Sequence, residues 1–234
     1  MHNKFSIHEG GACSMVIILD GSGRRILRSG ASEDGAVNGS LDFDRVVLRK
    51  DARINLVYII MPETRADVDL AVELDGEGAE ALVSGIYLCR GEDRVQIDMD
   101  IRHNVPHCIS RQLFKGLAGG SARVGFYGKI TVAQDAQKTE AYQENHSIIL
   151  SDAAKVDTKP QLEIYADDVK CSHGATVGRL DEEEQFYMRS RGIPEDEAKV
   201  LQMLSFLSPV LDNVDDPDIR EEISAAVDSA VRNL

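Results

Sequence analysis

The sequence predicts a mainly β protein with a small α-helical module at its C-terminus. From about Arg45 to Val177, apolar and polar residues alternate with a period of two, and clusters of turn residues separate the alternating runs. Beyond about Gly178, apolar residues recur at the three- and four-residue spacing of amphipathic helices. We therefore expect a β core over residues 1–180 and a helical module over residues 181–234.

The N-terminal segment, residues 1–44, is rich in Gly, Ser and Asp. Within it, residues 16–19 form an apolar run, and residues 20–23 read Asp-Gly-Ser-Gly. A short apolar run that ends in such turn residues predicts one strand and a turn before the regular alternation begins.

The central segment contains three well-marked strands in which apolar residues share one parity. These residues are Val68, Leu70, Val72 and Leu74 in the first strand, Val95, Ile97, Met99 and Ile101 in the second, and Val124, Phe126, Ile130 and Val132 in the third. Because successive side chains point to opposite faces of a strand, the pattern predicts one buried face and one solvated face.

Turn residues separate these strands at Asp75-Gly76, at residues 91–93 and at Gly119-Gly120. No amphipathic helix lies between the strands, which argues against βαβ winding. A succession of short strands is compatible with a sandwich, a barrel or a β-solenoid. The sequence shows no fixed-period repeat, so periodicity alone does not choose among these three folds.

The C-terminal module carries start and stop signals for three helices. Acidic residues at 181–184 precede Gln-Phe-Tyr-Met at 185–188 and mark a helix start. Gly192 is the expected helix stop, and Pro194 opens the next helix. Asp216-Pro217 is a capping residue followed by a first-turn proline. The expected apolar faces comprise Ala198, Val200, Leu201, Met203, Leu204, Phe206 and Leu207 in the second helix, and Ile219, Ile223, Val227, Ala230, Val231 and Leu234 in the third.

The charge of the chain narrows the classes of partner. Its 26 Lys and Arg residues against 40 Asp and Glu residues give a net charge of −14. This balance argues against binding to nucleic acid or to an anionic membrane surface. The acidic C-terminal module suits either a basic partner or a solvated helical face.

The four cysteines, Cys13, Cys89, Cys108 and Cys171, are widely spaced and include no C-x-x-C pair, which argues against a disulfide scaffold. The chain begins without an apolar leader and contains no apolar run of about 20 residues. We therefore expect a cytoplasmic protein.

The segment at 166–178 contains a thiol and an imidazole two residues apart, Cys171 and His173, followed by Gly-Ala-Thr-x-Gly. In an extended segment these two side chains share a face, and both are ligands that iron and iron–sulfur species accept. Two ligands do not complete a tetrahedral site, and C-x-H is not a zinc pattern. A buried Cys beside a hydrogen-bonded His is the alternative interpretation.

The wider segment around this pair resembles the SufB/SufD family of iron–sulfur cluster assembly scaffolds. The resemblance rests on residues 136–145, 150–154 and 158–169, on the Cys-Ser-His-Gly-Ala-Thr motif at 171–176, which is similar to the SufD branch, and on residues 186–193. It is dense from about Gly85 to Leu207. It implies a right-handed parallel β-helix, an irregular β-solenoid, with a C-terminal helical module. Members of the family usually carry an N-terminal helical region, which this sequence lacks.

The resemblance also implies a function. The chain is expected to be a non-catalytic, dimer-forming scaffold subunit that pairs with a SufB-like subunit or with an identical copy. His173, and less directly Cys171, are the expected cluster-assembly residues, where iron or a transient Fe–S cluster binds at a subunit interface. A SufC-like ATPase is expected to bind the helical module through an exposed part of the stripe that contains Leu201, Leu204, Phe206 and Leu207.

Other constellations point to weaker alternatives. His103, His107 and Cys108 lie close in sequence, but Pro106 disfavours a helix there and no H-E-x-x-H motif is present. We therefore expect a loop position with ordinary hydrogen bonds. Neither residues 21–24 nor residues 116–120 match a phosphate-binding loop, so ATP hydrolysis is left to a partner.

Paired aspartates support one rival function. Asp67 and Asp69, and likewise Asp98 and Asp100, share a strand face, as in a carbohydrate-active β-solenoid that uses outward carboxylates. Aspartates on the solvated face of a strand explain the same pattern, and the scarcity of aromatic residues argues against a groove that stacks sugars.

Overall fold

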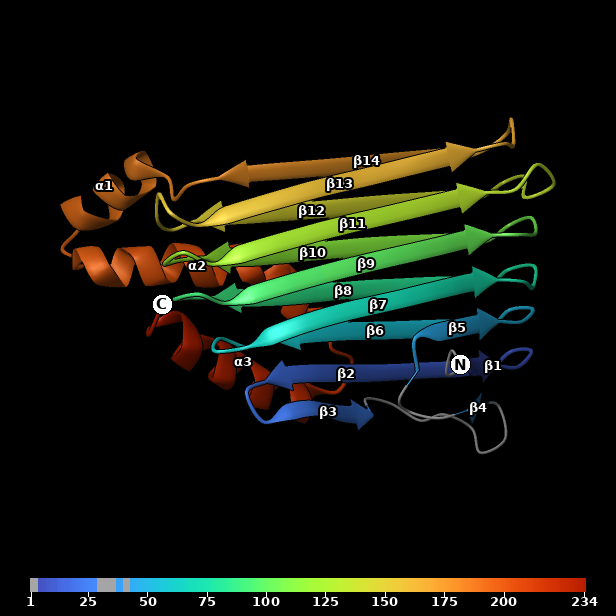
Figure 1. The fold of residues 1–234 in the computed structure, drawn as a ribbon, viewed down its shortest axis with the longest axis horizontal. Coiled ribbons are helices and arrows are strands. Elements are labelled where there is room, and N and C mark those ends of the chain that lie inside the picture. Colours follow the sequence, from blue (N-terminus) through green and yellow to red (C-terminus); the bar gives the residue numbers. More distant parts are fainter. Residues whose placement is uncertain (1–3, 29–36, 40–42) are drawn as a thin grey trace.

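A computed structural model describes residues 4–28, 37–39 and 43–234 and shows stacked β coils followed by three helices (Figure 1). The fold is a β-solenoid with a C-terminal helical module, as the resemblance implied.

The described strands form two seven-stranded sheets. Sheet A consists, in spatial order, of β13 (Lys155–Ile164), β11 (Arg123–Val132), β9 (Arg94–His103), β7 (Arg65–Leu74), β5 (Arg45–Leu48), β1 (Lys4–Ile7) and β4 (Val37–Gly39). Sheet B consists of β14 (Lys170–Gly178), β12 (Glu140–Ile149), β10 (Ile109–Ala118), β8 (Glu80–Cys89), β6 (Arg53–Ile60), β2 (Ala12–Asp20) and β3 (Gly23–Arg28).

From β5 onward, consecutive strands alternate between the two sheets, so each coil adds one strand to each sheet. The pairs between these strands are parallel, whereas β4 pairs with β1 and β3 pairs with β2 in antiparallel orientation. The predicted strand at residues 16–19 is longer than expected, because β2 pairs along most of its length with β6.

The interior between the sheets is built from columns of residues in register. Val68 on β7 pairs with Ile97 on β9, and Ile97 pairs with Phe126 on β11. All three side chains are buried in one apolar cluster with residues of sheet B. The alternation predicted for these strands is confirmed, with apolar residues inside and polar residues outside.

The turns between coils stack on one another, and this stacking explains one glycine. Gly120 has φ of +61°, and a Cβ atom at that position would lie 2.5 Å from the backbone nitrogen of Gly91 in the preceding turn. Only glycine combines this left-handed conformation with so close an approach. The turns predicted at Asp75-Gly76, residues 91–93 and Gly119-Gly120 are confirmed.

The three predicted helices are also confirmed. They are α1 (Glu182–Ser190), α2 (Glu195–Leu211) and α3 (Pro217–Val231). Asp181 caps α1 by accepting hydrogen bonds from two backbone N–H groups of its first turn, and Asp216 caps α3 in the same way. Pro194 directly precedes α2, and Gly192, with φ of +88°, lies in the turn after α1.

The helices and sheet B share a second core. Val57, Ile59 and Leu88 on the outer face of sheet B pack in one buried cluster with Leu207 of α2 and Val227 of α3. Figure 1 shows α2 and α3 behind the strands, on the side of sheet B. The outer face of sheet A has no such cover among the described residues and carries mainly polar side chains.

In the part of the chain that is described, no helix has both the length and the apolar character that crossing a bilayer requires.

Candidate functional site

The solenoid ends in two strands whose outer edges lack a neighbouring strand within the described residues. β13 pairs only with β11, and β14 pairs only with β12, so each leaves one edge open (Figure 1, top). We call this layer, β13 and β14 with the side chains that continue the solenoid interior, the open end. Unpaired backbone N–H and C=O groups of this kind accept a strand from another chain.

His173 and Cys171 both lie in the open end. Cys171 is in register with Ala141 of β12, and His173 is in register with Gln143. Both β12 residues are fully buried between the sheets. Because residues in register point to the same side of a sheet, Cys171 and His173 project from the interior face, about 6.6 Å apart along the strand. The imidazole of His173 is exposed because no further coil covers it.

Cys171 is half-buried and packs against the core between the sheets. Burial raises the pKa of its thiol, and a backbone hydrogen bond at Ala141 opposes this effect. The thiol is therefore protonated at neutral pH, and it must release its proton to bind a metal ion. The packing interpretation thus holds in part for Cys171 and does not hold for His173.

A polar layer lies directly beneath the pair, inside the last coils. Gln143 donates a hydrogen bond from Nε2 to Oε1 of Gln112 over 3.2 Å, and Asn145 donates from Nδ2 to Oγ1 of Thr158 over 2.9 Å. Oε1 of Gln143 and Oδ1 of Asn145 are buried without a hydrogen-bond partner among the described residues. This layer was not predicted, although the interior parity of Gln143 and Asn145 on β12 marks it once the strand is known.

The pair does not form a complete metal site. Within the described ranges, no group of three or more His, Cys, Asp and Glu residues can hold a metal ion. The chemistry of the donors fits iron, because an imidazole and a thiolate are both accepted by iron–sulfur species. Cys171 and His173 can therefore supply two ligands to iron or to a cluster fragment.

His103, His107 and Cys108 have structural surroundings. His103 is fully buried at the end of β9, and its Nε2 lies 2.8 Å from Oγ of Ser110. Burial lowers the pKa of His103 to about 4, so the ring is neutral. His107 is exposed in a turn, and Cys108 donates from Sγ to the carbonyl of Gly76 over 3.3 Å. The expected hydrogen bond is confirmed for His103, but its expected loop position is wrong, because His103 is the last residue of β9 and pairs with Val132 of β11.

The outward aspartates lie on the solvated face of sheet A, as their parity predicted. Asp98 accepts a hydrogen bond from Gln96, and Asp100 forms an ion pair with Arg102. Asp67 and Asp69 are exposed on β7. Two of these four carboxylates are thus occupied by neighbours on their own strand, an arrangement typical of a strand's solvated face.

The four residues expected to contact an ATPase do not all reach the surface. Leu201 is 39% exposed, and Leu204 and Phe206 are half-buried. Lys115 Nζ lies 4.6 Å from the ring centroid of Phe206. Leu207 is fully buried between α2 and sheet B, so placing it in a contact surface was wrong. Its position in the helix turns it toward the sheet rather than toward solvent.

An exposed aromatic pair on α1 was missed in the sequence. Phe186 is 72% exposed and Tyr187 is 58% exposed. Tyr187, Met188 and Leu201 line a groove of about 880 Å³ between α1 and α2. The signal was present in the sequence, because residues 186–188 are large and mainly apolar on a helix whose other residues are polar or charged. Exposed apolar surface of this kind marks a contact with another protein.

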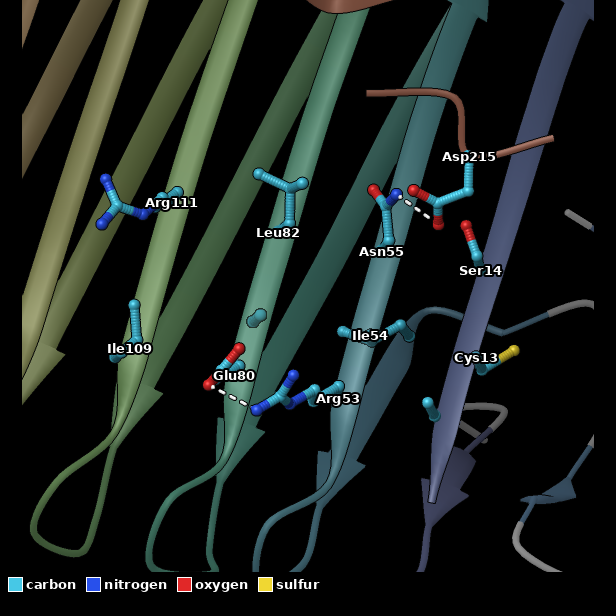
Figure 2. Close-up of a pocket in the computed structure, with 12 residues that line it drawn as sticks. Cys13, Ser14, Arg53, Ile54, Asn55, Glu80, Leu82, Ile109, Arg111 and Asp215 are labelled. Carbon is cyan, nitrogen blue, oxygen red and sulfur yellow. Dashed lines mark hydrogen bonds and ion pairs between the residues drawn. The ribbon is translucent and has the colours of Figure 1, made fainter. Parts of the chain in front are cut away.

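A second groove, of about 530 Å³, lies on the outer face of sheet B beside the loop between α2 and α3 (Figure 2). Four of its polar side chains are engaged in pairs. Arg53 of β6 pairs with Glu80 of β8 over 3.2 Å, and Asn55 donates to Asp215 over 3.1 Å. The contact between Asn55 and Asp215 fastens the loop to the sheet.

Comparisons with known proteins agree with the resemblance. Residues 11–206 match the family model "SUF system FeS cluster assembly, SufBD core domain". The chain is 38% identical over 157 residues to the iron–sulfur cluster assembly protein SufD of Escherichia coli (strain K12), covering 67% of this chain and 37% of that protein. It is 34% identical over 165 residues to an iron–sulfur cluster assembly SufBD family protein of Synechocystis sp., covering 70% and 36%. It is 28% identical over 183 residues to SufD of Bacillus subtilis (strain 168), covering 78% and 42%. The chain thus spans less than half the length of these relatives.

Proposed function

The chain belongs to the SufBD core family of the SUF system, and we propose that it is a non-catalytic scaffold subunit for iron–sulfur cluster assembly. The observation that carries this proposal is the position of His173, exposed in the open end of a β-solenoid beside Cys171. Iron and sulfide are the cargo of the scaffold, and the polypeptide binds and orients them.

The open end is the surface that we assign to subunit pairing. Its two edge strands present unpaired backbone groups, and Ile164 and Val177 are exposed there by 41% and 42%. A second subunit that stacks its own final coil on this layer would pair the backbone groups and cover the apolar side chains. The partner in this proposal is a SufB-like subunit or a second copy of this chain.

Pairing also completes the ligand shell. His173 supplies an imidazole nitrogen, and Cys171 supplies a thiolate after losing its proton. The partner supplies the remaining ligands across the interface at the open end, so the iron or cluster fragment is held between two chains. A shared site of this kind explains why the described residues offer only two suitable donors.

The helical module is the surface that we assign to a SufC-like ATPase. Tyr187, Leu201 and the half-buried Phe206 line the groove between α1 and α2. The same two helices also carry the exposed Phe186 and the half-buried Leu204. No phosphate-binding loop motif occurs in the sequence, so nucleotide binding and hydrolysis belong to the ATPase in this proposal.

Anaerobic cluster assembly on the complex with SufB-like and SufC-like subunits tests the proposal. His173→Ala should abolish the visible absorbance of a newly formed cluster while the complex keeps its size. Ser172→Ala is the matched control, because Ser172 is exposed on the opposite face of the same strand. Full cluster formation by an intact His173→Ala complex would refute the role given to His173.

A further inference from the structure

Four cations form a ladder across the solvated face of sheet A. Arg65, Arg94 and Arg123 begin β7, β9 and β11, and Lys155 begins β13. Each residue is directly in register with the next, and all four are exposed. We call these four residues the basic column. The three arginines are equally spaced in the sequence, so each coil places its cation at the same point.

The cations of the basic column differ in their ion pairing from other cations on the same strands. Among the described residues, none of its four members lies within ion-pair distance of an Asp or Glu side chain. Cations further along the same strands behave differently. Arg102 pairs with Asp100, Lys129 with Glu163 over 3.7 Å, and Lys159 with Asp157 over 2.8 Å.

This contrast has an electrostatic consequence. Like charges directly opposite each other on neighbouring strands destabilise a sheet. The chain has 40 acidic residues and a net charge of −14, so partners for these cations are plentiful in its composition. An anionic partner would therefore reduce the repulsion among these four aligned cations, which lack a carboxylate partner among the described residues.

The basic column borders a groove of about 770 Å³. The floor includes Gly125, where a Cβ atom would lie 2.1 Å from Oε1 of Gln96, so the missing side chain deepens the hollow. Asp67 and Asp157 also line the groove, and Asp157 is already engaged by Lys159. The lining thus retains an excess of positive charge.

We propose that the basic column binds an acidic α-helix of a partner protein, lying across the strands of sheet A. The spacing supports a helix over an extended chain. Neighbouring strands are about 4.8 Å apart, whereas same-face residues of an extended chain are about 6.6 Å apart. Carboxylates at i, i+3 and i+4 of a helix are about 5–6 Å apart. Three strand spacings span about 14 Å, which about ten helical residues match at a rise of 1.5 Å each.

This inference goes beyond the scaffold role and is tested on the 234-residue chain itself. The probe is a fluorescent Ala-rich peptide of about 20 residues with Glu residues along one helix face. A second peptide of the same composition distributes its Glu residues around the helix. Fluorescence anisotropy at low ionic strength should show binding of the striped peptide at least about tenfold tighter than the second peptide, weakening as salt is added.

Two double variants compare cations of the basic column with cations of sheet A that form ion pairs. Arg94→Gln with Arg123→Gln should weaken binding by about tenfold or more. Arg102→Gln with Lys159→Gln removes the same charge from the same sheet face and should leave binding within about twofold. Thermal unfolding checks that both variants fold, and the Arg94 and Arg123 variant should melt no lower than the wild type.

Three results would overturn the inference. The first is no preference for the striped peptide, and the second is an equal loss of binding in both double variants. The third is binding of inorganic phosphate or of a single-stranded oligonucleotide as tight as that of the striped peptide, which would identify a general anion site. None of these results bears on cluster assembly at His173.

Discussion

The two ends of the solenoid differ in their edge strands and in the polarity of their interiors. At the N-terminal end, short antiparallel strands close the sheets, and the interior is apolar, with Phe5, Met15 and Leu56 fully buried. At the C-terminal end, two parallel strands stop with open edges, and the interior contains Gln143 and Asn145. Short edge strands are a known protection against unwanted pairing.

The difference between the two interiors suits the N-terminal end to stabilising the fold and the open end to binding. An apolar interior supplies the burial that drives folding, at roughly 25 cal/mol per Å² removed from water. A polar interior beneath exposed donors contributes less to folding, but it leaves hydrogen-bonding groups available to a ligand or a second chain. We therefore expect substitutions near the N-terminal end to change stability and substitutions at the open end to change assembly.

The largest expected effect comes from the apolar end. Leu56→Ala removes a fully buried side chain from the core between the sheets and should lower the free energy of unfolding by about 2–5 kcal/mol. Val177→Ala, at the open end, should cost less than about 1 kcal/mol, because Val177 is 42% exposed. Urea denaturation of both variants measures the two values, and equal losses would erase the distinction between the ends.

The next effect is a loss of stability at low pH caused by His103, in the middle of the solenoid. Burial lowers its pKa to about 4, from the ordinary 6.5. Its contribution to stability is therefore fully present above pH 6.5 and is lost as the pH falls through 4, by about 3 kcal/mol in all. Unfolding free energies measured across this range should show the loss. His103→Gln should flatten that part of the profile, and an unchanged profile would assign the loss to other groups.

A charge placed on the open end should weaken pairing. Val177→Lys puts a cation on an exposed apolar position next to the unpaired edge of β14, and we expect a loss of about 10-fold or more in pairing affinity. Ser22→Lys adds the same charge to the exposed turn between β2 and β3 and should have no effect. Sedimentation of the isolated chain, or of the chain mixed with a SufB-like subunit, distinguishes the two outcomes.

The smallest expected effect is the contribution of Cys171 to the pH dependence of iron binding. Burial raises the pKa of its thiol, so the proton must be displaced at neutral pH. The apparent iron affinity should rise with pH, by at most about 1.4 kcal/mol per pH unit, until the pH passes that raised pKa. Anaerobic iron titration of the complex measures the slope. Cys171→Ser should remove it, and a slope that survives would exclude the thiol as a ligand.

The fold was largely predictable because its rules are local. The alternation on β7 and β9, the turn glycine at 120 and the capping aspartates at 181 and 216 each act within a few residues. Alternation alone did not distinguish a solenoid from a sandwich or a barrel, because all three use strands with one buried face. Motif resemblance supplied that choice.

The candidate site was less predictable, because it depends on contacts between coils. Cys171 and His173 were visible as a pair, but their place in the last coil follows from the register of β14 with β12. The burial of Leu207 and the exposure of Phe186 depend on how the helices lie against sheet B. The basic column arises from the register between successive coils, which no single strand reveals.

Hydrogen exchange of the backbone amides, with and without an added SufB-like subunit, tests the proposed role of the open end most directly. Residues 170–178 of β14 should gain protection of about tenfold or more on pairing, because edge amides that face solvent become hydrogen-bonded. Residues 23–28 of β3, at the opposite end, should exchange at the same rate in both states. Protection at β3 with no change at β14 would contradict the assignment of the open end as the surface where subunits meet.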